Sequence, residues 1–173
     1  MKIKNKQSEL TNRRRAEQIV LKKEIVMEIT GQTAVVTGGA SGLGKAAAEM
    51  LASKGAKVAV LDMNGDAAET VSRTTGGLGM ECDVTDPEKV QIALGKISDS
   101  IGVPRMCINA AGVGTAGLVI GKEGPLPLEK FSRVIDINVN GTFNVLRLAA
   151  ANMVELEPLP TTERGIIINV SSV

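Results

Sequence analysis

One stretch decides the fold of this chain, Thr33-Ala34-Val35-Val36-Thr37-Gly38-Gly39-Ala40-Ser41-Gly42-Leu43-Gly44. An apolar run leads into its glycines, and an alanine-rich run with helical periodicity, residues 45–54, follows them. Glycines let a backbone approach an anion closely, and the unpaired N–H groups and the dipole of a helix N-terminus attract negative charge. The stretch therefore predicts a strand, a glycine turn and a helix that together bind the phosphates of a nucleotide.

The rest of the chain alternates between short apolar runs and longer helical patterns. We expect strands at 33–36, 57–62, 78–81, 105–109 and 165–170, separated by helices at 45–54, 66–73, 85–101 and 128–154. Strands that alternate with helices form right-handed βαβ units and a parallel sheet. The predicted fold class is therefore α/β, a doubly wound (Rossmann) three-layer parallel sheet, with the strand order typical of that fold, 3-2-1-4-5. Within the last helix, Asn138, Asn140 and Gly141 predict a kink.

Composition excludes several classes of site. The chain has 173 residues, a net charge of +1, no His and two Cys. Without His, neither a Ser-His-Asp or Cys-His triad nor a histidine metal site can form. Cys82 and Cys107 lie in or beside predicted strands and lack CxxC spacing, so we expect two buried reduced thiols of a cytoplasmic protein and no metal site. The apolar runs are too short to cross a membrane as a helix.

Charge is distributed unevenly along the chain. Residues 1–26 hold more Lys and Arg than Glu, whereas the remainder is mildly acidic. We predict a disordered extension over 1–26 and one nucleotide-binding domain over 27–173. A mitochondrial presequence and a nucleic-acid-binding arm are the alternatives for the extension. The mildly acidic body is typical of an enzyme that acts on a small molecule, and we expect no nucleic-acid or membrane partner for it.

Two kinds of nucleotide loop fit the glycines. Residues 39–45 match the G-x-x-x-x-G-K of a P-loop, but the next residue, Ala46, lacks the hydroxyl that binds Mg²⁺. The alternative is a dinucleotide loop with glycines at 38, 42 and 44. Asp62 favours it, because it ends the second predicted strand, where a carboxylate accepts hydrogen bonds from the adenosine ribose and repels a 2′-phosphate. We therefore expect NAD as the cofactor, rather than NADP or ATP.

From about Gly31 onward the sequence resembles the short-chain dehydrogenase/reductase family. The resemblance rests on five motifs in the right order besides Asp62: the glycine stretch 37–44, Asp83-Val84, Asn109-Ala110-Ala111-Gly112, Ile137-Asn138-Val139-Asn140-Gly141, and Asn169-Val170-Ser171-Ser172-Val173. Within the family it is most similar to the type 2 3-hydroxyacyl-CoA dehydrogenase branch, through the insert 113–127, the segments 131–134 and 141–145, and the loop 155–164. The resemblance implies hydride transfer between NAD and a secondary alcohol, of which a 3-hydroxyacyl-CoA is the expected one. It also implies that the five-stranded sheet is incomplete on its C-terminal side.

The resemblance also implies a role for each matching residue. It places Ser41 and Leu43 against the cofactor phosphates, Asp62 on the ribose, and Asp83 and Val84 on the adenine. It implies that Ser172 bonds the reacting oxygen of the substrate and that Asn138 supports an active-site lysine through water, unless Asn138 only satisfies the kink. Asp83 has a similar alternative as the cap of a turn. The complete cofactor-binding set is Gly38, Ser41, Gly42, Leu43, Gly44, Asp62, Asp83, Val84, Asn109, Ala110 and Gly112.

The sequence departs from the family at its acid/base residue. The family uses the tyrosine of a Tyr-x-x-x-Lys motif that follows the serine, and this chain contains no tyrosine and ends one residue after Ser172. We therefore expect negligible dehydrogenase activity from these residues alone, since general acid–base catalysis is worth roughly 10²–10⁴-fold. Two classes stay open, an NAD-dependent dehydrogenase whose full-length form is a homo-oligomer, and a non-catalytic NAD-binding chain.

Overall fold

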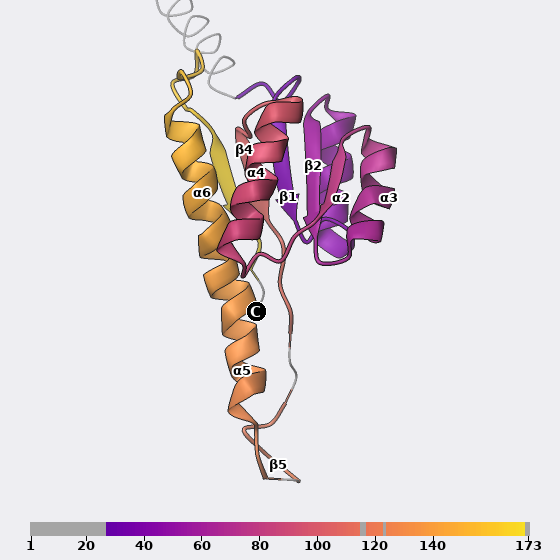
Figure 1. The fold of residues 1–173 in the computed structure, drawn as a ribbon, viewed down its shortest axis with the longest axis vertical. Coiled ribbons are helices and arrows are strands. Elements are labelled where there is room, and N and C mark those ends of the chain that lie inside the picture. Colours follow the sequence, from indigo (N-terminus) through magenta and orange to yellow (C-terminus); the bar gives the residue numbers. More distant parts are fainter. Residues whose placement is uncertain (1–26, 115–116, 123, 172–173) are drawn as a thin grey trace, which may run out of the picture. The chain divides into compact units, whose positions relative to one another are not determined.

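The computed structural model describes residues 27–114, 117–122 and 124–171 (Figure 1). The predicted extension 1–26 and the predicted catalytic Ser172 lie outside these described residues. The chain divides into two units. The larger one, of which residues 29–114, 117–122, 124–157 and 164–171 are described, carries the sheet and the site. The smaller unit includes the turn 158–163, in which the Leu159 N–H donates to the Glu163 carbonyl at 2.8 Å.

Strands and helices alternate along the larger unit. In chain order they are β1 (Thr33–Thr37), α2 (Gly42–Ser53), β2 (Lys57–Asp62), α3 (Gly65–Thr75), β3 (Leu78–Glu81), α4 (Pro87–Ile101), β4 (Met106–Asn109), β5 (Ile120–Gly121), β6 (Gly124–Pro125), α5 (Leu128–Ile135), η1 (Asp136–Gly141), α6 (Thr142–Val154) and β7 (Ile166–Asn169). The central strands β1 and β4 are buried along their whole length. Such strands have near-continuous apolar sequences because helices cover both faces of a parallel sheet.

The main sheet has five strands in the order β3-β2-β1-β4-β7, and every neighbouring pair is parallel. In its centre, Ala34 of β1 lies opposite Val58 of β2 on one side and Met106 of β4 on the other. This arrangement confirms the predicted α/β doubly wound fold and the strand order 3-2-1-4-5, with β7 as the fifth strand. The strand order reverses between β1 and β4, and ligands of such folds bind at the carboxyl ends of the strands beside that point.

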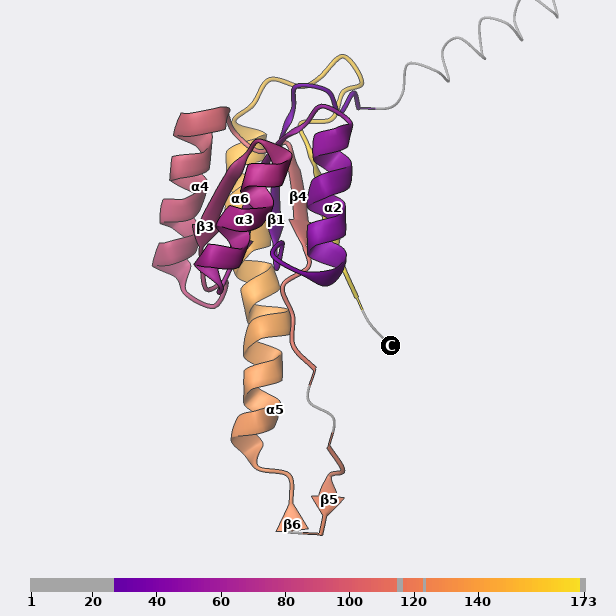
Figure 2. The same cartoon turned by 90° about the vertical axis from the view of Figure 1, so that its right-hand side faces the viewer.

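Helices cover the sheet in two layers. Helices α2 and α3 pack on one face, and α4 and α6 pack on the other (Figures 1 and 2). The main core cluster lies between the sheet and the second pair, and it includes Val35, Leu61, Ile97, Val145 and Met153. Ile167 of β7 packs against this cluster, whereas its neighbours on the strand are about half exposed, Ile166 at 44% and Ile168 at 46%.

Helix α4 begins at Pro87, two residues after the start predicted at 85. Its N-cap is Asp86, whose carboxylate accepts from the N–H groups of Glu88 and Lys89, with Pro87 in the first turn. The Thr85 hydroxyl instead donates to Asp83 at 2.7 Å. Threonine and aspartate are both good N-cap residues, but the Thr85 hydroxyl is bonded to Asp83 in the preceding turn, so Asp86 caps the helix.

The long pattern at 128–154 forms three consecutive helical segments, α5, η1 and α6. Asn138, Asn140 and Gly141, at which a kink was predicted, lie in a π-helical turn, η1, in the middle of the helix. Single π turns inside α-helices often mark functional sites. The insert before α5 contains a small antiparallel hairpin, β5 and β6, which the sequence pattern did not indicate because each strand has only two residues.

Candidate functional site

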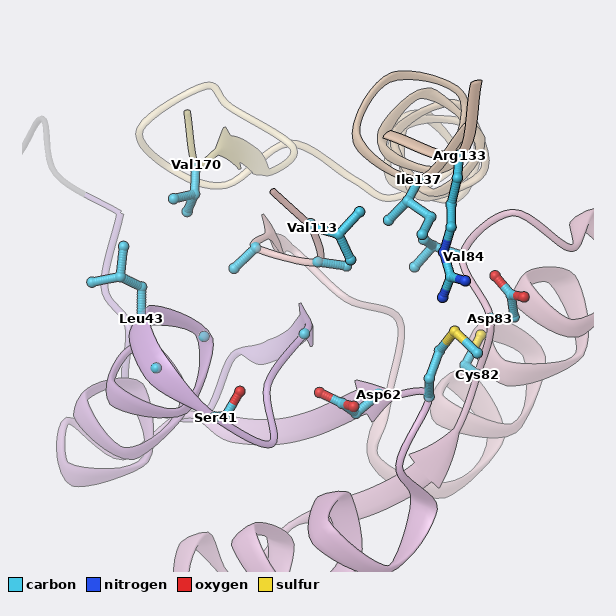
Figure 3. Close-up of a pocket in the computed structure, with 17 residues that line it drawn as sticks. Ser41, Leu43, Asp62, Cys82, Asp83, Val84, Val113, Arg133, Ile137 and Val170 are labelled. Carbon is cyan, nitrogen blue, oxygen red and sulfur yellow. The ribbon is translucent and has the colours of Figure 1, made fainter. Parts of the chain in front are cut away.

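A cavity of about 410 Å³ lies at the carboxyl ends of the strands, beside the point where the strand order reverses (Figure 3). Its lining comes from the loop after β1, the end of β2, the segment after β3, the segment after β4, the α5–η1 helix and the end of β7. The lining residues are Gly38, Ser41, Gly42, Leu43, Gly44, Asp62, Met63, Cys82, Asp83, Val84, Ala110, Ala111, Gly112, Val113, Arg133, Ile137 and Val170.

The glycine loop presents an uncapped helix N-terminus to this cavity. Ser41 is extended (φ −150°, ψ 171°), and its side chain makes no capping hydrogen bond to α2. Gly42 has φ +51°, and a Cβ there would meet no atom within 4 Å, so this backbone faces open space. Gly44 lies so close to the Gly38 carbonyl oxygen that any Cβ would collide with it. The arrangement fits a phosphate, because free N–H groups and the helix dipole face an open approach.

The Asp62 carboxylate is held rigidly at the end of β2. Its Oδ2 accepts from the Ala40 N–H in the glycine loop at 3.1 Å, and its Oδ1 accepts from the Asn64 N–H at 3.0 Å. The side chain is half-buried and lines the cavity. Each carboxylate oxygen can accept a second hydrogen bond, so Asp62 can still bind hydroxyl groups of a ligand.

Asp83 and Val84 lie on the segment that follows β3. Asp83 caps a turn, because its Oδ1 accepts from both the Thr85 N–H at 2.9 Å and the Thr85 hydroxyl at 2.7 Å. Its Oδ2 makes no hydrogen bond in the described part of the chain, so turn capping and ligand binding are compatible. Asn144 of α6 donates to the Val84 carbonyl at 2.8 Å and fixes the backbone there.

The segment after β4 is held against the glycine loop. The buried Thr37 hydroxyl accepts from the N–H groups of Ala110 and Ala111, both at 3.2 Å. A Cβ on Gly38 would come within 2.7 Å of the Ala111 backbone, which explains a glycine at this position. The ends of β1 and β4 therefore approach closely and form one wall of the cavity.

Two predicted site residues hold the cavity wall in place by hydrogen bonds but do not line the cavity. Asn138 in η1 accepts from the Val113 N–H and donates to the Val113 carbonyl, each at 2.9 Å. Asn109 is buried at the end of β4, where its Nδ2 donates to Asn169 Oδ1 of β7 at 2.9 Å. The other predicted cofactor-binding residues all line the cavity, and the predicted Ser172 is outside the described residues.

Sequence reasoning did not single out six further residues of the cavity wall, Met63, Cys82, Ala111, Val113, Arg133 and Ile137, nor Val170 as a wall residue. Arg133 and Ile137 are four residues apart, so they share a helix face, but their spacing does not indicate what that face meets. Met63 directly follows Asp62, which places it at the same strand end. A second cavity of about 510 Å³ adjoins these residues, lined also by Thr85, Leu128, Glu129, Ser132 and Asp136.

Neither cysteine is a nucleophile at neutral pH. Both are free and buried, as predicted. Burial, with the nearby Asp83 and Asp86 carboxylates, raises the pKa of Cys82 to about 11, and burial raises the pKa of Cys107 to about 12. The thiolate is the reactive form, so Cys82 is a neutral, apolar part of the cavity wall. Among the described residues, no group of His, Cys, Asp and Glu could hold a metal ion, and no helix could cross a membrane.

Curated relatives of this chain are dehydrogenases. It is 40% identical over 149 residues to 3-hydroxyacyl-CoA dehydrogenase type-2 of Homo sapiens, an alignment that covers 84% of this chain and 57% of that protein. It is 34% identical over 148 residues to 2,5-dichloro-2,5-cyclohexadiene-1,4-diol dehydrogenase of Sphingobium indicum, covering 84% and 56%. The chain therefore spans little more than half the length of these relatives.

A solved structure of the same fold carries a different name. The crystal structure of a ribose-5-phosphate isomerase from Brucella melitensis 16M matches with a TM-score of 0.73 and 34% identity, over 83% of this chain and 52% of that one. The family model for short chain dehydrogenases matches residues 32–173, which include every strand of the main sheet and the whole cavity. By its sequence, its sheet and its relatives, this chain belongs to the short-chain dehydrogenase family of oxidoreductases.

Proposed function

We propose that the chain binds NAD in the 410 Å³ cavity as part of an oxidoreductase that acts on a secondary alcohol. The observation that carries the proposal is the Asp62 carboxylate at the end of β2. The N–H groups of Ala40, in the glycine loop, and of Asn64 hold it in place. Members of this family generally bind NAD or NADP. A carboxylate at this position accepts hydrogen bonds from the ribose hydroxyls and opposes a 2′-phosphate by charge and space, which favours NAD.

The cavity offers suitable groups for each part of a dinucleotide. The open backbone at Gly42 and the uncapped first turn of α2 would hold the pyrophosphate, with Ser41 and Leu43 beside it. The free Oδ2 of Asp83 would accept from the exocyclic amine of adenine, and Val84 would contact the ring. When bound, NAD supplies the hydride acceptor, and the protein's residues bind and orient it.

We propose a 3-hydroxyacyl-CoA as the alcohol, because the human relative is named for that substrate and is 40% identical. The diol dehydrogenase of Sphingobium indicum, at 34% identity, leaves other secondary alcohols as alternatives. Ser172 would hydrogen-bond the reacting oxygen, and Asn138 would hold the cavity wall. We further propose a homo-oligomeric full-length form that works in the cytoplasm without nucleic-acid or membrane partners; the two unpaired cysteines are typical of a reducing compartment.

A second candidate is a non-catalytic NAD-binding chain. It is favoured by the sequence itself, because none of the 173 residues is a tyrosine and the family's acid/base group is a tyrosine. Under either candidate, the 173-residue chain binds NAD and turns over little. Steady-state turnover of acetoacetyl-CoA with NADH, clearly above that of a Ser172→Ala variant, would favour the enzyme over the non-catalytic candidate for this chain.

Titration of the full chain with NADH and NADPH tests the cofactor proposal. The chain has neither Trp nor Tyr, so the fluorescence of bound NADH is free of aromatic background. We expect tighter binding of NADH, and we expect Asp62→Asn to weaken NADH binding about 10-fold or more, since hydrogen bonds to a charged group are worth about 1.5–3 kcal/mol. Asp66→Asn, an exposed carboxylate of α3 outside the cavity, is the control. Equal affinities of wild type and Asp62→Asn for NADH would contradict the proposal.

A further inference from the structure

Arg133 reaches into the cavity from helix α5 with a free guanidinium. It lines both the 410 Å³ cavity and the adjoining 510 Å³ cavity. Figure 3 shows its side chain descending from the helix toward Cys82 and Asp83. Among the described residues its guanidinium has no ion pair and no hydrogen bond, although Glu129 and Asp136 lie one turn away on the same helix.

Met63 faces the same space from the sheet side. It follows Asp62 at the end of β2, its side chain is 60% exposed, and it also lines both cavities. Four residues are shared by the two cavities, Met63, Asp83, Arg133 and Ile137. The shared region is therefore a slot between the helix and the sheet. The flat guanidinium of Arg133 and the aliphatic Ile137 lie on its helix side. The thioether of Met63 lies on its strand side, and the Asp83 carboxylate lies at its edge.

This combination of groups fits a flat aromatic ring. A guanidinium plane stacks on aromatic faces, and a thioether makes favourable contacts with aromatic rings. A carboxylate at the edge of the slot can accept a hydrogen bond from an exocyclic amine. Adenine has two faces and an exocyclic amine, whereas the nicotinamide end of a dinucleotide would lie past the glycine loop, toward Val170.

We propose that Arg133 positions the adenine ring of the nucleotide by stacking its guanidinium on one face of the ring, with Met63 against the other face. The inference rests on the proposed function, since it assumes that the cavity binds NAD. It assigns to α5 a direct part in cofactor binding, which the glycine loop and the carboxyl ends of the strands would otherwise perform alone. It also explains why an arginine with acidic neighbours on its own helix has no partner among the described residues.

Calorimetric titration of the full chain with ADP-ribose and with nicotinamide mononucleotide tests this role. We expect Arg133→Ala to weaken the binding of ADP-ribose and NADH by about 5- to 10-fold, as befits a partly desolvated cation–aromatic contact. Nicotinamide mononucleotide lacks adenine, so its affinity should not change. Arg133→Lys keeps the charge and loses the flat face, and we expect most of the loss to remain. Lys130→Ala, on the same helix and outside both cavities, is the matched control.

Each alternative gives a distinct result. If Arg133→Lys binds ADP-ribose as tightly as wild type, the residue acts by charge and the stacking role is wrong. If Arg133→Ala changes the affinity for NADPH alone, the residue serves a 2′-phosphate, which also overturns the inference. Binding of ADP-ribose within twofold of wild type by Arg133→Ala overturns it directly while the proposed function stands. A wild-type chain that binds neither NADH nor ADP-ribose overturns both. Arg133 is exposed and makes no buried contact, so these variants should melt as wild type does.

Discussion

The side-chain amide of Asn138 pairs with both backbone polar groups of Val113, each at 2.9 Å. An asparagine amide has one donor edge and one acceptor edge, so it can bond the N–H and the carbonyl of one residue, as the backbone of a neighbouring strand would. Val113 belongs to the cavity wall, and Asn138 belongs to the π turn between α5 and α6. The π turn and the wall after β4 are therefore joined by a single side chain.

Asn138→Ala should loosen this wall. We expect a loss of about 1–2 kcal/mol in the free energy of unfolding, the usual cost of two hydrogen bonds to partly exposed backbone, and several-fold weaker NADH binding. Asn138→Asp has the same shape but places an oxygen against the Val113 carbonyl, so we expect a similar or larger loss. Urea unfolding and NADH titration measure both effects. Asn140→Ala, whose amide bonds only Asp136 on the same turn, is the control, and an Asn138→Asp variant as stable as wild type would contradict the prediction.

Gly44→Ala should disrupt the nucleotide loop. Its new methyl group would collide with the Gly38 carbonyl, so the loop or the start of α2 must shift. Overpacking of this kind costs about 1–3 kcal/mol, and we expect at least a 10-fold loss of NADH affinity. Gly95→Ala in the middle of α4 is the matched control, because a Cβ there meets nothing within 4 Å. That variant should gain about 0.5–1 kcal/mol of stability and bind NADH normally; a normal Gly44→Ala variant would show that the close contact is unimportant.

The free energy of unfolding should fall above pH 9. Burial raises the pKa of Cys107 to about 12 in the folded chain, from an ordinary value of 9.0. Between these values the unfolded chain releases a proton that the folded chain keeps, so unfolding becomes more favourable, by up to about 1.4 kcal/mol per pH unit for Cys107. Cys82, whose pKa is raised to about 11, adds to the slope in the same direction. Urea unfolding at pH 8, 9.5 and 10.5 measures the slope. Cys107→Ala should have a shallower slope, and equal slopes would refute the prediction.

At pH 8 a thiol reagent should modify Cys82 and Cys107 only after unfolding.

Arg105→Lys should destabilise the folded chain by weakening the contacts that hold the segment before β7. The two guanidinium nitrogens of Arg105 donate to the Arg164 carbonyl at 2.8 Å and to the Glu157 carbonyl at 2.9 Å. A lysine ammonium cannot reproduce this fork, and we expect a loss of about 1–2 kcal/mol. Arg73→Lys tests the same exchange in an exposed ion pair with Glu69, where the effect should be under about 1 kcal/mol. Equal effects of the two substitutions would argue against the fork.

The sheet could be predicted because its signals are local. The run Lys57–Asp62 is a strand with those bounds in the structure, and β3 begins and ends as predicted at Leu78 and Glu81. The parallel sheet followed from the alternation of strands and helices, and its strand order is the one typical of a doubly wound fold. The glycine loop and the Asp62 position were also readable, because the spacing of the glycines and a carboxylate after a buried strand are features of the sequence itself.

What could not be predicted depends on contacts distant in sequence. The π turn accompanies a contact between Asn138 and Val113, which are 25 residues apart, and helical periodicity contains no such information. The start of α4 was predicted two residues too early, because the hydroxyl of Thr85 bonds Asp83 and Asp86 caps the helix instead. Arg133 was not predicted as a cavity residue, since only the folded structure shows that this helix face meets the end of β2.

The cavity brings together the ends of strands that are far apart in the chain. Its wall runs from Gly38 after β1 to Val170 after β7, with contributions from β2, β3 and β4 between them. A ligand that needs all of these segments has no binding site in the unfolded chain, so it stabilises the native state by mass action. Each tenfold excess of free nucleotide over its Kd should then raise the free energy of unfolding by about 1.4 kcal/mol. Occupancy of this site is thus a direct report on whether the whole sheet has folded.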